Sequence, residues 1–243
     1  MTDSAEPTLS PWESADDCPI PMSHDRFEEA HYFFHEMLEH YHVPVRFRFS
    51  ANAFLSALKA VAAMLQSELQ PRGLSGWLRT QRAVMDETDP LLRTFHKGRD
   101  IVLHQRSLFN ESQVEAGLFR NRQLKLAFNF TVPTDAPSEV ILRSAVERFT
   151  GTYLDAEHSE VGMEIGVRRW WRDHRLAPDT DVVTAAHVAW ARTSELISEA
   201  HRQCGYSSDP RPEAPGSHSV ANYNLLTESD LDPTAFQRWG WLD

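Results

Sequence analysis

The sequence predicts a mainly α-helical protein, an antiparallel helical bundle with an inserted β-hairpin and a helical C-terminal extension. Three observations support this fold class. Apolar residues recur at helical spacing over most of residues 25–205. One stretch, residues 114–132, switches to the strict alternation that is typical of half-buried strands. No internal repeat interrupts this order, so a solenoid is not expected.

Four helices are predicted in the N-terminal half. The first is expected over 25–41, because Val43-Pro44 disfavours helix immediately before the proline. The second is expected over 50–69, with Ser50 as its N-cap. A third helix is expected to begin at Ser75. A fourth is expected to begin at Pro90, since Asp89 is a good N-cap and proline suits the first helical position.

The C-terminal half combines a hairpin with further helices. Residues 114–118 and 123–132 alternate between apolar and polar, with turn-forming Asn121 between them, which predicts a β-hairpin. Helices are expected over 138–150, 160–174 and 180–202. Gly205 follows the last of these as a stop signal.

Charge is concentrated at the two ends of the chain. The 243 residues carry a formal net charge of -11, of which -6 falls in residues 1–25 and -4 in residues 206–243. The four expected regions are a disordered acidic tail, a helical core, a hairpin with C-terminal helices packed on that core, and a Pro/Ser-rich acidic tail; they span 1–22, 23–112, 113–205 and 206–243. The near-neutral core therefore does not exclude a nucleic-acid partner, and the acidic tails are candidates to shield a site by mimicking nucleic acid.

Composition also limits the compartment and the cofactors. No apolar run is long enough to span a membrane, and the acidic N-terminus lacks the apolar core of a signal peptide, so a cytoplasmic protein is expected. Cys18 and Cys204 are the two cysteines, too few for a disulfide framework or for a structural zinc site. We expect no metal and no cofactor.

The segment around residue 99 contains the most informative motif. The sequence reads DPLLRTFHKGRDIVLHQ over 89–105, and it places Asp100 directly after Arg99 and His104 five positions after the arginine. It follows FSANAFLSALKAVAAMLQSEL over 49–69. Together these segments resemble the HEPN superfamily, whose motif is an arginine, a polar residue and a histidine four to six positions after the arginine. The resemblance covers residues 24 to 108.

The resemblance implies a metal-independent endoribonuclease that works as a homodimer, with a toxin-like or defence role and a cognate neutralising protein. Arg99, Asp100 and His104 would form its catalytic set. Histidine can exchange a proton near neutral pH, and a permanently charged arginine suits the phosphorane-like transition state. On a regular helix, positions five apart point about 140° apart. A helix irregularity at Gly98, the length of Arg99, or a second protomer would each bring the groups together, and we favour the second protomer.

Two other clusters have alternative interpretations. Arg168, Arg169, Arg172 and Arg175 surround Trp170 and Trp171, a mixture that can bind RNA through phosphate contacts and base stacking, or can be core tryptophans with surface ion pairs. His31 and His35, with nearby acids, form one stripe of the first helix. That stripe is either a solvated polar face or a weak metal site.

Two rival functions therefore stand beside the endoribonuclease. One is a non-catalytic HEPN-like scaffold that binds RNA or a protein partner. The other is a metal-binding helical protein that uses His31 and His35. Sequence motifs for nucleotide binding and for serine hydrolases are absent.

Overall fold

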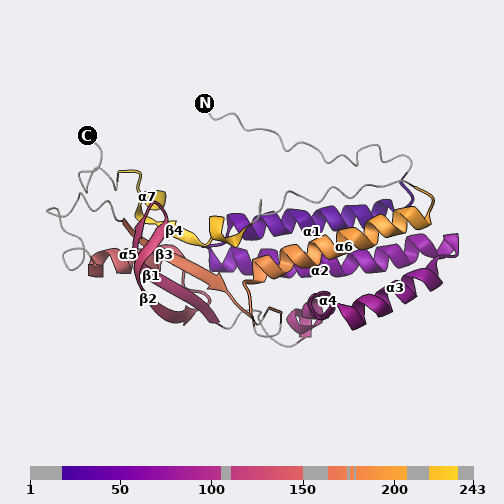
Figure 1. Cartoon of the computed structure of the whole chain (residues 1–243), viewed down its shortest axis with the longest axis horizontal. Helices are drawn as coiled ribbons and strands as arrows, with labels where there is room; N and C mark the ends of the chain where they lie inside the picture. The colour runs from indigo at the N-terminus through magenta and orange to yellow at the C-terminus, as the bar shows by residue number, and fades with distance from the viewer. Residues whose placement is uncertain are drawn as a thin grey trace, which may run out of the picture.

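The protein is built from a group of helices and a β-sheet, which lie end to end (Figure 1). The computed structural model describes residues 18–104, 111–149, 164–173, 176–177, 179–206 and 219–234. The sheet unit carries its own short helices. The helical unit contains the first and the last long helix of the chain, so segments that are distant in sequence lie side by side.

Five helices form the helical unit. Helix α1 packs on α2 and α6, while α4 packs on α2, α3 and α6. Their bounds are α1 Pro21–Glu39, α2 Pro44–Leu69, α3 Ser75–Thr88, α4 Pro90–His104 and α6 Val182–Gln203. A 3-10 turn at Gln70–Arg72 and Gly73, at φ 74°, join α2 to α3. In the part of the chain that the structure describes, no helix combines the length and apolar character needed to cross a bilayer.

Several helix ends follow the sequence prediction, and one does not. The Asp89 carboxylate accepts a hydrogen bond from the Leu92 backbone N–H at 2.9 Å, which confirms the predicted cap of α4. Helix α2 begins at Pro44 instead of Ser50, because proline without an N–H is well suited to the first helical turn. Ser50 consequently lies inside the helix, where its hydroxyl donates to the Arg46 carbonyl at 3.0 Å.

The sheet unit is a four-stranded antiparallel sheet in the order β2-β1-β3-β4. The strands are β1 Glu111–Arg120, β2 Gln123–Pro133, β3 Glu164–Trp171 and β4 Leu225–Thr227, with helices α5 Ser138–Phe149 and α7 Glu228–Leu231. The predicted hairpin is confirmed as β1–β2. Its two turn residues, Asn121 and Arg122, both have positive φ, as a tight primed turn requires.

The predicted fold class was wrong, because the protein is mixed α/β and not a helical bundle with one hairpin. Residues 164–171, expected within a helix over 160–174, form the inner strand β3. Residues 225–227, expected within the C-terminal tail, add the edge strand β4. Alternate residues of β3, among them Ile165 and Val167, pack under α5 in a second hydrophobic core that is separate from the helical one.

A buried polar junction joins the two units. Trp171, at the end of β3, stacks on Phe47 of α2 with ring centroids 4.3 Å apart, and its indole N–H donates to the Tyr41 carbonyl at 2.9 Å. Asp181, the N-cap of α6, accepts from the backbone N–H of Trp171 and of Val183, each at 2.8 Å. One carboxylate therefore fixes both the end of the sheet and the start of the last long helix.

The N-terminus of α1 is capped by a side chain from α2. The buried Glu68 carboxylate accepts from the backbone N–H of Met22 at 2.6 Å, from that of Ser23 at 3.1 Å, and from the Ser23 hydroxyl. A carboxylate at this position satisfies unpaired helix N–H groups and is favoured by the helix dipole.

Replacing Glu68 by alanine is therefore expected to reduce the free energy of unfolding by about 2–4 kcal/mol, because buried donors lose a charged acceptor. Urea denaturation measures this loss. The matched control is Glu87→Ala, an exposed acid on α3, for which a change within about 0.5 kcal/mol is expected. Equal losses in the two variants would contradict the capping role.

Candidate functional site

Helix α4 carries the motif that the sequence singled out. The helix is continuous from Pro90 to His104, so Gly98 introduces no break. The backbone positions of Arg99 and His104 are therefore about 140° apart around the helix axis. The side chains of residues 98–104 lie outside the part of the chain that the structure describes.

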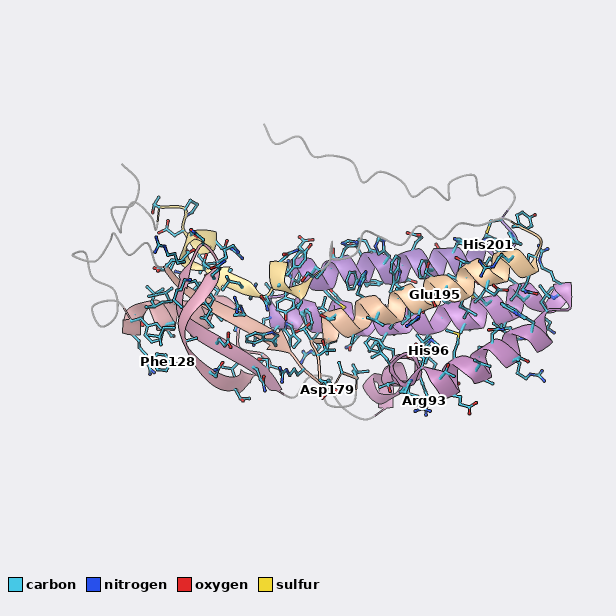
Figure 2. All side chains as sticks on the ribbon, viewed as in Figure 1. Arg93, His96, Phe128, Asp179, Glu195 and His201 are labelled. Carbon is cyan, nitrogen blue, oxygen red and sulfur yellow. The ribbon has the colours of Figure 1, made fainter. Side chains whose placement is uncertain are left out.

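One turn before the motif, α4 forms the wall of a hollow with α2 and α3. The hollow measures about 340 Å³, which is within the range of small-ligand sites. His96 lines it from α4, Lys59 and Ser56 from α2, and Arg82 from α3. Figure 2 shows His96 on the side of α4 that faces the long helices.

The electrostatics of the hollow suit an anion beside a neutral imidazole. Burial lowers the pKa of His96; Asp86 opposes this shift, Arg82 and Lys59 add to it, and Asp89 opposes it. The His96 ring is therefore neutral near pH 7 and able to accept a proton. Lys59 and Arg82 supply two cationic groups that can contact a phosphate.

Part of the motif continues along the side of α4 that carries His96. Positions 96, 99 and 100 are related by three and four residues, so their backbone positions are neighbours on one helix face. Position 104 follows one turn after Asp100. His96, Lys59 and Arg82 were not predicted from sequence, although the spacing of His96 to Arg99 and Asp100 is a signal that could have identified the histidine.

Strand β3 places two of the arginines predicted to bind RNA, Arg168 and Arg169, on opposite faces of the sheet. Because successive residues of β3 point to opposite faces, Arg169 and Trp171 lie on the buried face, whereas Arg168 and Trp170 lie on the other. Arg172 follows the strand and is exposed. Arg175 lies outside the described residues.

Arg169 is a structural residue and is not accessible to RNA. Its side chain is fully buried and donates to the Ser112 hydroxyl at 2.9 and 3.2 Å and to the Ser138 hydroxyl at 3.2 Å. Its guanidinium also lies 4.4 Å from the centre of the Trp171 ring. Burial lowers its pKa to about 10, so the group remains charged at pH 7.

Arg168 and Arg172 differ in their surroundings. Arg168 is three-quarters buried, 3.8 Å from the Glu115 carboxylate and over the ring of Phe119. Arg172 and Trp170 border a hollow of about 320 Å³ on the open face of the sheet. The other residues of this hollow include the polar side chains Gln113, Asn129 and Thr131. A cation beside a partly exposed indole is a suitable contact for one phosphate and one stacked base.

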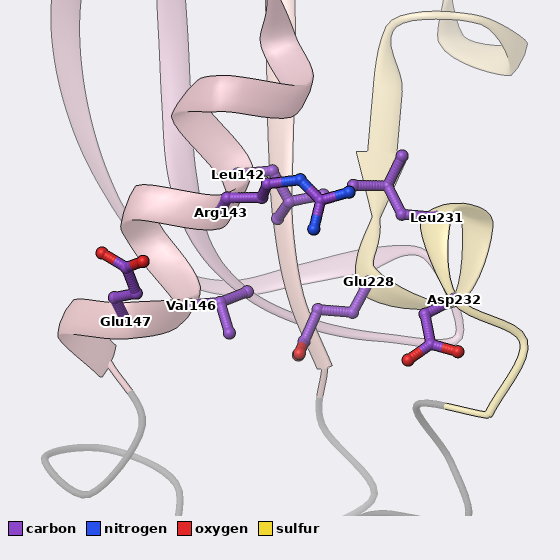
Figure 3. Close-up of a pocket in the computed structure, with 7 residues that line it drawn as sticks. All are labelled: Leu142, Arg143, Val146, Glu147, Glu228, Leu231 and Asp232. Atoms are coloured by element: carbon purple, nitrogen blue, oxygen red, sulfur yellow. The ribbon is translucent and has the colours of Figure 1, made fainter.

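The lining of a third hollow, between α5 and α7, does not combine a cation with an aromatic ring (Figure 3). It contains one arginine, Arg143, whose guanidinium pairs with Glu139 at 2.8 Å. The Glu228 carboxylate in its wall accepts from the backbone N–H of Ile165 at 3.1 Å, and therefore holds α7 on β3. Of its charged groups, Arg143 is paired with an acid and Glu228 positions α7.

The histidine stripe of α1 contains a close pair of imidazoles. The Nε2 atoms of His31 and His35 are 3.0 Å apart, and His31 stacks on Trp190 of α6 with ring centroids 4.7 Å apart. Part of this stripe therefore packs against a neighbouring helix. Among the described residues, neither histidine belongs to a cluster of three or more metal-ligating side chains.

The comparison with known families gives one result. The family model for bacteriophage lambda protein ea47 matches residues 12–221. The chain belongs to the ea47 family. No curated protein and no solved structure matches it. The ea47 match includes α1 to α6, β3 and the hollow with His96, and it ends before β4.

Proposed function

We propose that this protein binds RNA along α4 and cleaves it without a metal ion. The observation that carries the proposal is the hollow beside the motif, where neutral His96 lies with Lys59 and Arg82. The resemblance of Arg99-Asp100-x3-His104 to the HEPN motif supplies the reaction class. Partly exposed Trp170 and exposed Arg172, beside the open face of the sheet, would provide a second contact for single-stranded RNA.

The proposed reaction is an attack of the RNA 2′-oxygen on the adjacent phosphorus. A new 2′-O–P bond forms and the P–O5′ bond breaks, which leaves a 2′,3′-cyclic phosphate and a 5′-hydroxyl. One imidazole accepts the proton of the 2′-hydroxyl, and a protonated imidazole donates to the departing 5′-oxygen. His104 takes one of these roles by resemblance, and His96 is the second imidazole on the same helix. Arg99, with Lys59 and Arg82, stabilises the negative charge that develops on the non-bridging phosphate oxygens.

The decisive experiment is RNA cleavage in the presence of EDTA by the wild type and by His104→Ala. The rate is expected to fall at least about 100-fold in the variant, the typical contribution of a general acid or base. His35→Ala, an exposed histidine on α1, is the matched control and should retain the wild-type rate. Circular dichroism must show that the variants remain folded. Equal rates for His104→Ala and the wild type would overturn the assignment.

Two further variants test the rival function, a non-catalytic scaffold that binds RNA. A protein that binds RNA in the hollow should lose affinity in Lys59→Gln and Arg82→Gln. The slope of log affinity against log salt concentration should become shallower by about one for each phosphate contact removed. Affinity that depends on these residues without any cleavage would favour a non-catalytic RNA-binding scaffold. Sedimentation of the wild type shows whether the motifs are paired in a homodimer.

A further inference from the structure

A thiol and two imidazoles lie together where the start of α1 is beside the end of α6. Cys18 precedes α1, His24 lies in the first turn of α1, and His201 lies in the last turn of α6. Their Sγ and ring nitrogen atoms all lie within 4.8 Å of one another. His201 is 177 residues from His24 and 183 from Cys18, so only the fold brings the three together (Figures 1 and 2).

Two of the three distances between these atoms match the edges of a tetrahedral metal site, and the third, between Cys18 and His24, is no more than 4.8 Å. With zinc–nitrogen bonds of about 2.0–2.1 Å and a zinc–sulfur bond of about 2.3 Å, tetrahedral angles place two nitrogens about 3.3 Å apart and a nitrogen and a sulfur about 3.6 Å apart. The His24 and His201 Nε2 atoms are 3.1 Å apart. The Cys18 Sγ is 3.5 Å from the His201 Nε2. Small side-chain adjustments would therefore admit an ion.

The surrounding helix orients His201 for this role. Its Nδ1 lies 3.1 Å from the Ile197 carbonyl oxygen, which can only accept, so Nδ1 carries the proton and Nε2 carries the lone pair. In metal-bound histidines the other ring N–H commonly donates to a backbone carbonyl, which fixes the orientation of the ring. The C-terminal end of α6 also favours a nearby cation, because helix carbonyls point toward it.

The chemistry of the cluster favours a metal ligand set over a thiol nucleophile. Burial lowers the pKa of His24 to about 4, and the nearby His201 adds to this shift; burial also lowers the pKa of His201. Both rings are thus neutral at pH 7, as metal binding requires. Burial is likewise the main cause that raises the pKa of the Cys18 thiol, whereas a catalytic cysteine needs a lowered one.

We propose that Cys18, His24 and His201 bind one Zn²⁺ ion, which fastens the segment before α1 to the end of α6. Cys204, the C-cap residue of α6, lies three positions after His201 but does not belong to the cluster, so a water molecule would complete the tetrahedral set. The charge of Cys204 acts on the Cys18 thiol, as do those of Glu68 and Arg72. Two cysteines alone are too few for a structural zinc site, and no sequence pattern indicates that two distant histidines lie beside Cys18.

The test is a titration of the full, untagged chain, stripped with a chelator and kept reduced, with Co²⁺ as the spectroscopic probe and Zn²⁺ as the competitor. We expect one Co²⁺ per chain, a thiolate-to-cobalt charge-transfer band, and loss of that band when Zn²⁺ is added. Because both imidazoles are already neutral, about one proton per ion should be released at pH 7, from the Cys18 thiol.

Variants locate the site. Cys18→Ala and His201→Ala should weaken binding by at least about 100-fold. Loss of a group that only orients a metal ligand weakens metal affinity by about 10- to 100-fold, so loss of a ligand itself should cost at least as much. Cys18→His should restore binding without the charge-transfer band, which separates loss of a ligand from loss of the fold. The matched control is His35→Ala, because His35 and His31 form the other close imidazole pair, at 3.0 Å, but lack a thiol.

Three results would overturn the proposal. The first is a wild-type chain that binds no Co²⁺ or Zn²⁺. The second is an unchanged charge-transfer band in Cys18→Ala. The third is loss of binding in His35→Ala together with normal binding in His201→Ala. The proposed RNA cleavage is assayed separately and needs no metal, so its failure would leave this test unaffected.

Discussion

Replacing Asp181 by alanine is expected to reduce the free energy of unfolding by about 3–5 kcal/mol, among the largest effects of any single change in this protein. The carboxylate accepts from the Trp171 and Val183 backbone N–H groups at 2.8 Å and from the Tyr41 hydroxyl at 2.6 Å. All four residues are buried. The variant therefore loses the cap of α6 and leaves buried donors that water cannot reach.

Urea denaturation followed by tryptophan fluorescence measures this loss. Asp179→Ala is the matched control, because Asp179 lies two residues earlier and is exposed (Figure 2). The control should change the free energy of unfolding by no more than about 0.5 kcal/mol. If both variants lost the same small amount, the Asp181 junction would not hold the two units together.

The contribution of Asp181 is also expected to depend on pH. Burial raises the pKa of its carboxyl from 3.8 to about 6, while hydrogen bonds from Tyr41, Val183 and Trp171 oppose the shift. Between these two values the folded state holds the proton more often than the unfolded state does. The wild type should therefore lose about 2 kcal/mol as the pH rises from 4 to 6, relative to Asp181→Asn, which lacks this titration. Parallel stability curves for the two proteins would contradict the raised pKa.

Local signals explain which elements were predictable from sequence. Asp89-Pro90, Asn121 and Gly205 each reflect a backbone requirement that acts within a few residues, and the structure confirms a cap, a tight turn and a helix end at these positions. Strand β3 was not predictable in this way. Its buried face carries Arg169 between Val167 and Trp171, so a charged residue interrupts the apolar alternation that identifies a strand.

The candidate sites show a second limit of sequence reasoning. Lys59, Arg82 and His96 come from three helices, and Cys18 and His201 are 183 positions apart in the sequence. No spacing rule connects such residues, because their proximity depends on how the helices pack. The motif on α4 was visible only because its residues lie within two helical turns.

Arg169 provides the sharpest test of the corrected strand. If β3 is an inner strand, Arg169→Ala should reduce the free energy of unfolding by about 3–5 kcal/mol, because it opens a cavity beside Trp171 and removes the donors to Ser112 and Ser138. Arg169→Met keeps most of the volume and removes a costly buried charge, so its loss should be smaller. Thermal and urea unfolding measure both variants.

Arg168→Ala is the matched control, because Arg168 is the adjacent residue on the opposite face of the same strand. Arg168 is about three-quarters buried and pairs with Glu115 at 3.8 Å, so a loss of about 1–2 kcal/mol is expected, smaller than for the fully enclosed Arg169. An RNA-binding role for Arg169 predicts the reverse order, with a stable Arg169→Ala protein whose RNA affinity falls. The buried network predicts instead that Arg169→Ala mainly lowers the free energy of unfolding. The guanidinium is enclosed by two hydroxyls and an indole, so it cannot reach a phosphate unless the sheet opens.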